Sequence, residues 1–514
     1  MRGKFPSRKL SGLIVSNRGT VLLLTVMVVF LMTTMAIGVL TLTGNALFLG
    51  KLRLAQAEAF NIAESGADMG VLWIRSQPAP PAGVSPISPF GDPVPIGNGT
   101  YSVTIYPEPD NPTSYLKTYR IISVGRVGTV EKTIEVVVQQ STFARFAYFT
   151  DKETSSITGG AIWWKAGEVC EGPAHSNSTN GSVFQINYNG STSPIFLDVL
   201  TSSGTYINYS PSRPRDETTF RRIFANGSKG FKLGVPRIEL PESTNVQRNA
   251  AWGSTSGFPS TNGVYLRANN YGGIYINGDC TMQLSVVNNV TQRIVVTQGA
   301  SVTTIDVDLD TGITTMTKPD GSTETAGLPN GVIYCTGNIS SLSGEVADNK
   351  LIFDEIVRRS SWTIATDVNA GKDIVLTGAL VYHTKPDKTK PTNDPQNLAA
   401  GTMGLFARNI VISSGAPPNM EIDAVCMAGG RNTANGSFYV ANYDKKKPTG
   451  TLRVLGGIIQ KARGPVGTFD SSTGQTLTGY AKSYSYDPRL ATNPPPYFPT
   501  TGTYDRISWR ILPD

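Results

Sequence analysis

The first 76 residues follow a helical pattern in two parts. Residues 19–50 carry no charged side chain and consist mainly of Leu, Val, Thr, Met and Gly. As a helix rising about 1.5 Å per residue, this run of 32 residues would be about 48 Å long, more than the ~30 Å core of a bilayer. Residues 51–75 are rich in Ala and Leu and contain no proline. The pattern therefore predicts one helix over 20–76 whose first half spans a membrane.

The pattern then changes from helix to strand. Residues 77–100 contain seven prolines, all before residue 96, and predict a stiff extended linker. Apolar and polar positions alternate in 101–105, and two further β-rich runs follow at 119–124 and 133–139. These runs predict three antiparallel strands in a small β domain over 101–147.

From residue 148 to residue 514, short β-branched runs alternate with turns rich in Gly, Asn, Ser and Pro. Runs such as 331–336 and 372–381 are continuously apolar, which suits strands covered on both faces. We expect a mainly β chain and, over about 260–480, a right-handed parallel β-helix. The runs have no fixed period, so a two-sheet sandwich stays as the alternative.

Composition and charge set the topology and the class of partner. Charged residues make up only 16% of the chain, and its 53 Gly and 33 Pro argue against helical bundles. The net charge is +7, of which Arg2, Lys4, Arg8, Lys9 and Arg18 supply +5, leaving 7 − 5 = +2 for the rest. Nucleic acid is therefore not an expected partner. The basic leader, residues 1–19, predicts a cytoplasmic N-terminus and export of everything after the apolar run.

The N-terminal motifs resemble those of PilX-type minor pilins and related pseudopilins. The likeness rests on Asn17-Arg-Gly-Thr20, the apolar helix, and Ala63-Glu-Ser-Gly-Ala67. It implies cleavage between Gly19 and Thr20 by a prepilin peptidase, with other pilins and the lipid bilayer as partners. The major-pilin pattern has Phe first and Glu fifth after the cut, whereas this chain has Thr20 and Leu24, as in atypical members that lack the glutamate.

Small residues recur along one stripe of the predicted helix. The stripe consists of Ala55, Ala59, Ala63, Gly66, Ala67 and Gly70. Small side chains at this spacing let another structural element approach the backbone closely. Two interpretations follow: the stripe packs against the helices of other subunits, or it docks on the chain's own globular part.

The C-terminal region carries a second resemblance. Gly172-Pro-Ala-His-Ser-Asn177, the glycine-rich stretch 450–467 and Tyr486-Asp-Pro-Arg-Leu490 are similar to an uncharacterised bacterial domain found behind pilin-like N-termini. The resemblance implies an architecture and no activity, so the roles of His175 and Asn177 stay unassigned. His175 reads as a structural residue in a turn.

Few residues are candidates for chemistry. The only other histidine, His383, precedes a Lys-rich loop. Asp306, Asp308 and Asp310 imitate a calcium loop but lack its glycine and glutamate, so a hairpin turning at 310–312 is the simpler prediction. The cysteines have no metal-binding spacing and either form up to two disulfides or stay buried; they are Cys170, Cys280, Cys335 and Cys426. We predict no catalytic, metal or cofactor site.

The sequence thus favours a structural protein over an enzyme. The leading hypothesis is a single-pass, pilin-like component of a type IV pilus or a related pseudopilus, displaying a large periplasmic or extracellular β domain over 148–514. Assembly priming or adhesion to a surface or glycan ligand would be its role. One alternative is a membrane-anchored β-helix enzyme acting on polysaccharide. Another is an envelope anchor protein without a pilus.

Overall fold

The computed structural model describes residues 18–77, 80–81, 83, 85–91, 93–108, 116–179, 184–188, 192–470 and 473–513. The chain divides into two compact units. Unit 1 comprises Met1–Pro107, Tyr119–Val138 and Arg506–Asp514, and unit 2 comprises Glu108–Thr118 and Gln139–Asp505. Residues 1–17 of the predicted leader lie outside the described residues.

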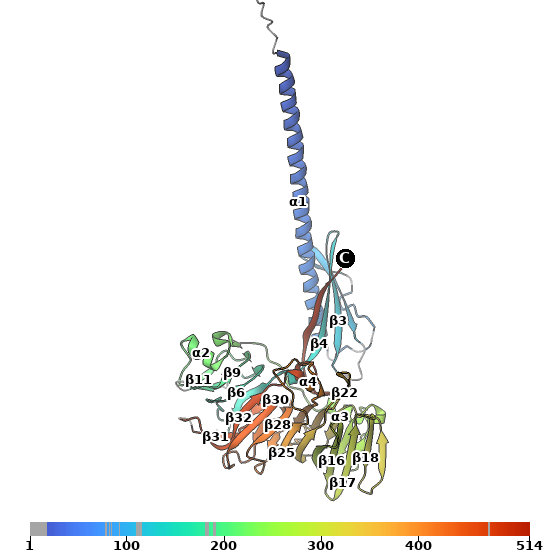
Figure 1. Ribbon diagram of the computed structural model, residues 1–514, viewed down its shortest axis with the longest axis vertical. Helices are drawn as coiled ribbons and strands as arrows, with labels where there is room; N and C mark the ends of the chain where they lie inside the picture. Colours follow the sequence, from blue (N-terminus) through green and yellow to red (C-terminus); the bar gives the residue numbers. More distant parts are fainter. Residues whose placement is uncertain are drawn as a thin grey trace, which may run out of the picture. The chain divides into compact units, whose positions relative to one another are not determined.

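Unit 1 consists of one long helix and a sheet. Helix α1 (Arg18–Ser76) runs without interruption for 59 residues. The sheet has the order β1-β2-β3-β4-β33. The strands are β1 (Val94–Ile96), β2 (Gly99–Pro107), β3 (Thr118–Val127), β4 (Val130–Thr142) and β33 (Thr500–Leu512). Buried positions alternate along β2 and β3, so one face of the sheet is apolar and the second half of α1 lies along it (Figure 1).

Two parts of unit 1 differ from the sequence prediction. Parts of the predicted stiff linker, 77–100, belong to the sheet, because β1 pairs antiparallel with β2 and Ile87 forms a bridge to Ile105. Proline is tolerated at such sheet edges. The sheet also includes the C-terminal strand β33, which the sequence analysis missed. There Arg510 Nε donates to Glu135 Oε1 over 2.7 Å, and the ring of Trp509 packs edge-on against Phe60.

Unit 2 is a stack of parallel coils. Three ladders of parallel strands run along it. The first ladder consists, in order, of β14 (Ile274–Asn277), β20 (Val332–Cys335), β24 (Ser361–Thr366), β26 (Thr402–Ala407), β28 (Met420–Ala428), β30 (Gly450–Arg463), β5 (Tyr148–Ser155), β7 (Ala174–Ser176), β10 (Leu200–Ser202) and β12 (Phe231–Leu233).

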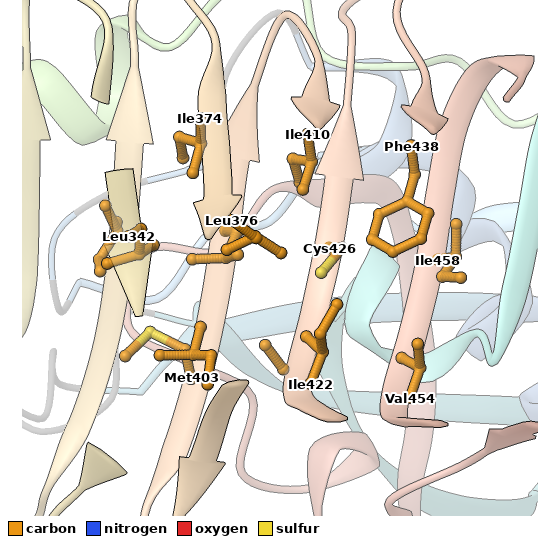
Figure 2. Packing of buried hydrophobic residues seen from close by; sticks show 14 of the residues in the cluster. Leu342, Ile374, Leu376, Met403, Ile410, Ile422, Cys426, Phe438, Val454 and Ile458 are labelled. Atoms are coloured by element: carbon orange, nitrogen blue, oxygen red, sulfur yellow. The ribbon is translucent and has the colours of Figure 1, made fainter. Parts of the chain in front are cut away.

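The other two ladders complete the coils. The second consists of β15 (Cys280–Val286), β21 (Ile339–Val346), β25 (Ile374–Tyr382), β27 (Ile410–Ile412) and β29 (Phe438–Val440). The third contains the ends of β25, β28 and β30, followed by β32 (Thr476–Ser485), β6 (Val169–Cys170) and β9 (Ile195–Phe196). Apolar side chains from successive strands, such as Leu376, Ile422 and Val454, fill the interior (Figure 2).

The chain enters this stack in its middle. Strand β5 pairs with β7 on one side and with β30 on the other, so Tyr148 lies between Ala174 and Ile458. The coils therefore form two series. The first series runs from β5 through β7 and β10 to β12. The second series runs from β14 to β32, and its last strand, β32, pairs with β6 of the first series. In Figure 1 the orange strand β32 accordingly lies next to the blue-green β6.

A segment that we call the strap, residues 235–252, crosses the coils between these two series. Its backbone bonds to Ser202, Asn177 and Arg431 in turn. It ends in α3 (Asn245–Trp252), which lies against β14 and β20. Leu240 and Trp252 of the strap join a second core on the outer face of the first ladder, with aromatic residues such as Tyr334.

The remaining elements of unit 2 lie outside the three parallel ladders. An antiparallel meander extends from β15 through β16 (Thr291–Gln298), β17 (Ser301–Asp308), β18 (Ile313–Thr317) and β19 (Thr323–Ala326). Shorter elements are α2 (Glu217–Ile223), α4 (Pro395–Ala399), β8 (Gln185–Asn187), β11 (Asn208–Ser210), β13 (Gly263–Leu266), β22 (Lys350–Ile352), β23 (Glu355–Arg358) and β31 (Gly467–Phe469).

Glycine allows the coils to stack closely at their corners. Gly344 and Gly456 have φ values of +129° and +142°, which side-chain-bearing residues rarely adopt. A Cβ at Gly456 would lie 2.4 Å from the carbonyl oxygen of Ala424 on the neighbouring coil. Part of the glycine-rich stretch 450–467 is therefore explained by backbone contact between coils.

The predicted class, a mainly β chain with a long N-terminal helix and a large β-rich body, is confirmed. The right-handed β-helix stays a prediction, although the two runs named as its basis, 331–336 and 372–381, lie in parallel ladders as β20 and β25. Parallel ladders also include β5, β7, β10 and β12, which lie before the range 260–480 predicted for the β-helix.

Candidate functional site

The first half of α1 is apolar and fully exposed. Leu24, Phe30 and Leu40 have exposed fractions of 65%, 70% and 71%. In the described part of the chain, α1 is the single helix that is long and apolar enough to cross a membrane. Gly19 and Thr20 lie in its first turn. Among the described residues, no atom beyond the chain neighbours and the helix's own backbone lies within 4 Å of a Cβ placed on Gly19. The residues of the predicted cleavage site are therefore exposed.

The stripe of small residues packs against the chain's own sheet. Ala59, Ala63 and Ala67 are buried, with exposed fractions of 2% or less. A Cβ on Gly70 would lie 3.1 Å from Ile121 Cγ2 of β3, and a Cβ on Gly125 would lie 2.1 Å from the carbonyl oxygen of Ala59. The sheet of unit 1 covers these residues, which supports the second interpretation, that the stripe docks on the chain's own globular part. The same holds for Gly66, next to Tyr101 and Ser123, whereas Ala55 is half-buried.

The opposite face of the second half of α1 is open. Leu54, Met69 and Leu72 are 69%, 40% and 53% exposed. Asp68 on this side pairs with Arg506 over 2.8 Å. Apolar side chains at helical spacing on an exposed face are available to another subunit, and the sequence analysis assigned them no role.

Two residues of the motif 172–177, His175 and Asn177, hold the strap in place through hydrogen bonds. His175 is buried on β7, stacks on Phe149, and binds Thr201 and Asn177 through its two ring nitrogens, each over 2.9 Å. Burial lowers the pKa of His175 below its ordinary value. Asn177 Oδ1 accepts from the backbone N–H of Ile238, and Asn177 Nδ2 donates to the carbonyl oxygen of Ile238 over 2.7 Å. The two motif residues are therefore structural.

Two other motif residues meet at the place where the coil series join. Gly172, with φ +101°, lies beneath Tyr486, and a Cβ there would lie 2.6 Å from Tyr486 Cβ. Close by in sequence, the buried Arg489 pairs with Asp487 and donates to the carbonyl oxygens of Ala400 and Gly401. The motifs that carry the second resemblance thus hold distant segments together.

Buried charges gather at the same junction. Glu153 lies 3.3 Å from Arg463, and Glu168 lies 3.0 Å from Lys482, with each carboxylate from one coil series and each cation from the other. Burial raises the pKa of Glu153 and lowers the pKa of Lys482. Glu153 and Glu168 are 0% and 3% exposed. A substrate in solution therefore cannot reach these carboxylates.

The other candidate residues are explained by local contacts. Asp306 pairs with Arg293 over 2.7 Å, and Gly312, with φ +78°, closes the predicted hairpin between β17 and β18. His383 lies 2.8 Å from Glu345. Within the described ranges, no three His, Cys, Asp or Glu side chains gather as metal ligands.

The four cysteines are buried and carry no disulfide; they are Cys170, Cys280, Cys335 and Cys426. The sulfur atoms of Cys280 and Cys335 lie 3.8 Å apart. Burial raises the pKa of the Cys170 thiol to about 12. The second of the two alternatives left by the sequence, burial as small apolar residues, is the one seen.

A polar groove of about 580 Å³ lies on the outside of unit 2. It follows the corner between the first and second ladders, where loops from β5, β24, β26 and β28 meet. Asn369, Asn409, Asn432 and Asn435 line it together with Arg408, Ser437 and Tyr439. The sequence analysis missed this site. One signal was available, because a polar residue directly precedes each strand of the second ladder: Asp279, Asn338, Asp373, Asn409 and Ser437.

Comparison with known proteins gives little guidance. No family model matches the chain, and no curated protein matches it. Among solved structures, the crystal structure of the competence-associated pilin ComZ from Thermus thermophilus is similar, with 12% sequence identity over 89% of this chain and 97% of that chain. The TM-score is 0.29, which does not establish a shared fold.

Proposed function

We propose that the protein is a pilin-like subunit, anchored by a single membrane-spanning helix and built into a type IV pilus or a related pseudopilus. Residues 20–50 would lie in the bilayer before assembly. Units 1 and 2 would lie on the periplasmic or extracellular side, since the basic residues before the helix favour the cytoplasm. Unit 2 would be displayed for adhesion or for priming of assembly.

The proposal rests mainly on the difference between the two halves of α1. Its first half exposes a continuous apolar surface, which is stable only in lipid or against other apolar helices. Its second half is buried on an antiparallel sheet of the same unit. One unbroken helix that serves as anchor and as core element is the plan of the pilins that the N-terminal motifs resemble.

Two surfaces of α1 would contact neighbouring subunits. One is the apolar half itself after it leaves the bilayer. The other is the open face with Leu54, Met69 and Leu72, which the sheet leaves uncovered. The small-residue stripe would contribute only by fixing α1 to its sheet.

Cleavage by a prepilin peptidase between Gly19 and Thr20 is part of the proposal. Both residues lie at the exposed start of α1, where a Cβ added to Gly19 meets no other side chain of the described residues. The proposed position within the assembly is a tip or an initiating complex, because unit 2, residues 139–505 with 108–118, is bulky for a subunit repeated along a fibre.

The alternative of a polysaccharide-degrading enzyme has weaker support. Glycoside hydrolysis uses a pair of accessible carboxyl groups flanking the substrate. Glu153 and Glu168 at the coil junction are buried inside the stack, and each is paired with a cation, Arg463 or Lys482. An envelope anchor without a pilus would retain the membrane helix and dispense with cleavage at Gly19.

The test is incorporation into sheared surface fibres in the native host. We expect the wild-type protein in the pilus fraction and a Gly19→Phe variant in the membrane fraction at equal total amount. Gly50→Ala, at another exposed helix position with nothing within 4 Å of the added Cβ, is the control and should behave as wild type. Equal recovery of wild type and Gly19→Phe from fibres would contradict the proposal.

A further inference from the structure

A regular row of polar residues runs beneath the groove on unit 2. Two of its members, Asn409 and Ser437, line the groove, and Asp373 does not. Asp373, Asn409 and Ser437 occupy equivalent positions on three successive coils, each directly before a strand of the second ladder. Asn409 donates from Nδ2 to Asp373 Oδ1 and accepts at Oδ1 from the backbone N–H of Ser437, both over 3.1 Å. Ser437 Oγ in turn lies 2.8 Å from Ser156 Oγ. Successive strands of a sheet are about 4.8 Å apart, so these three residues form a row of polar side chains along the stack.

The sides of the groove offer unused hydrogen-bonding groups. The side-chain amides of Asn369, Asn432 and Asn435 are exposed and bond to none of the described residues. Arg408 binds Asp373 through Nε and Nη2, over 2.9 Å and 2.7 Å, which leaves Nη1 available toward the groove. Each amide supplies a donor and an acceptor, whereas Arg408 supplies donors only.

The groove also contains one aromatic ring, and its described lining residues include no carboxylate. Tyr439 lies half-buried among these polar groups and presents part of its ring. No Asp or Glu is among the groove-lining residues of the described chain. An aromatic face with convergent amides suits a hydroxyl-rich and amide-bearing ligand. The same lack of carboxylates leaves the groove without an acid and base pair for glycoside hydrolysis.

We infer that this groove binds a linear polysaccharide of N-acetylated hexosamine units, lying along the coil stack. A sugar unit is about as long as one coil is high, so successive units meet equivalent corners of successive coils. The acetamido groups pair with the amides of Asn369, Asn432 and Asn435, and one sugar ring stacks on Tyr439. The inference deepens the adhesive role proposed above, and it rests on that proposal only for the exposure of unit 2 outside the membrane.

The test uses the purified full-length protein in detergent and measures binding by calorimetry. The probe is the β-1,4-linked hexamer of N-acetylglucosamine. Cellohexaose, which has the same backbone without acetamido groups, and polygalacturonate, which is acidic, serve as comparison ligands. We expect saturable binding of the N-acetylated hexamer and at least about tenfold weaker binding of both comparison ligands.

The variant Asn432→Ala/Asn435→Ala should weaken binding of the N-acetylated hexamer about tenfold. Asn226→Ala/Asn393→Ala removes two exposed amides elsewhere on unit 2 and should bind as wild type. Circular dichroism melting establishes that both variants are folded. Absence of binding by the wild type, equal binding of cellohexaose, or full affinity of the groove variant would overturn the inference.

Two readouts separate this inference from the proposed function. Mass spectrometry of the hexamer after incubation should show an unchanged chain length, and shortened products would overturn the binding role in favour of hydrolysis. Failure to bind in purified protein leaves cleavage at Gly19 and recovery in fibres unaffected. Loss of fibre recovery with intact hexamer binding would instead contradict the pilin-like role alone.

Discussion

At the scale of single residues, side chains that imitate backbone hold unit 2 together. Asn177 pairs its amide with both the N–H and the C=O of Ile238, as a neighbouring strand would. Arg237 adds bonds to the carbonyl oxygen of Asn177 and to Asp151 over 3.0 Å and 2.7 Å. Because the strap has no strand on this side, Asn177 supplies the partners that its backbone needs.

We therefore expect Asn177→Ala to loosen the strap. The substitution leaves two backbone groups of Ile238 unpaired and should cost about 1–3 kcal/mol of unfolding free energy. It should also speed tryptic cleavage after Arg237, measured by limited proteolysis of the native protein. Asn435→Ala, at an exposed amide, is the control. Unchanged melting and unchanged cleavage would show that the strap does not depend on this contact.

His175 makes stability depend on pH in a defined direction. Burial between Phe149 and the strap lowers its pKa, with Arg237 nearby adding to the effect. The folded state thus binds a proton less readily than the unfolded chain, in which histidine has an ordinary pKa of about 6.5. Stability is therefore present above that pH and falls as the pH drops below it, by up to about 1.4 kcal/mol per unit.

Denaturant unfolding between pH 7 and pH 5 checks this prediction. The wild type should lose more stability over this range than His175→Gln, which keeps polar atoms but does not titrate. Comparison with the variant cancels the contributions of the other titratable groups. Parallel pH profiles for the two proteins would refute the assignment.

At the scale of elements, close backbone contact decides how α1 meets its sheet. Gly125 on β3 lies under Ala59 and Ala63, where an added Cβ would lie 2.1 Å from a carbonyl oxygen and 2.5 Å from a backbone nitrogen. Neither atom can rotate away, in contrast to the end of a side chain. The small-residue stripe and Gly125 together therefore set the distance between helix and sheet.

Gly125→Ala should push α1 away from β3. We expect a lower melting temperature and faster amide hydrogen exchange over residues 55–70, followed by mass spectrometry. Gly50→Ala is the matched control, since nothing lies within 4 Å of its added Cβ and alanine favours a helix over glycine by about 1 kcal/mol. Unchanged exchange over 55–70 in Gly125→Ala would contradict this packing.

The hydrophobic pattern predicted the elements that depend on residues close together in sequence. The uncharged run 19–50 gave the helix, and the β-rich runs within 101–139 lie in β2, β3 and β4. The strand β33 was missed because its neighbour β4 lies more than 350 residues away in sequence. The alternation of apolar and polar residues in a strand indicates that one face is buried, but it does not indicate which strand is its neighbour.

At the scale of the whole chain, the order in which the strands of unit 2 stack could not be predicted either, because a strand's pattern does not identify its neighbours. Continuous apolar runs such as 372–381 indicated covered strands, and parallel pairing of β25 agrees with that. Nothing in the pattern near Tyr148 indicates that β5 stacks on β30. The groove was missed for a related reason, because its amides come from loops that only the stacking of coils brings together.

The central claim is that the chain follows the pilin route, with α1 released from its leader. The most direct test is the mass of the mature N-terminus, determined for protein expressed with its native prepilin peptidase and in a strain that lacks the enzyme. We predict a protein that begins at Thr20 only when the peptidase is present. An intact leader through Gly19 in both strains would contradict the claim and leave α1 as an uncleaved membrane anchor.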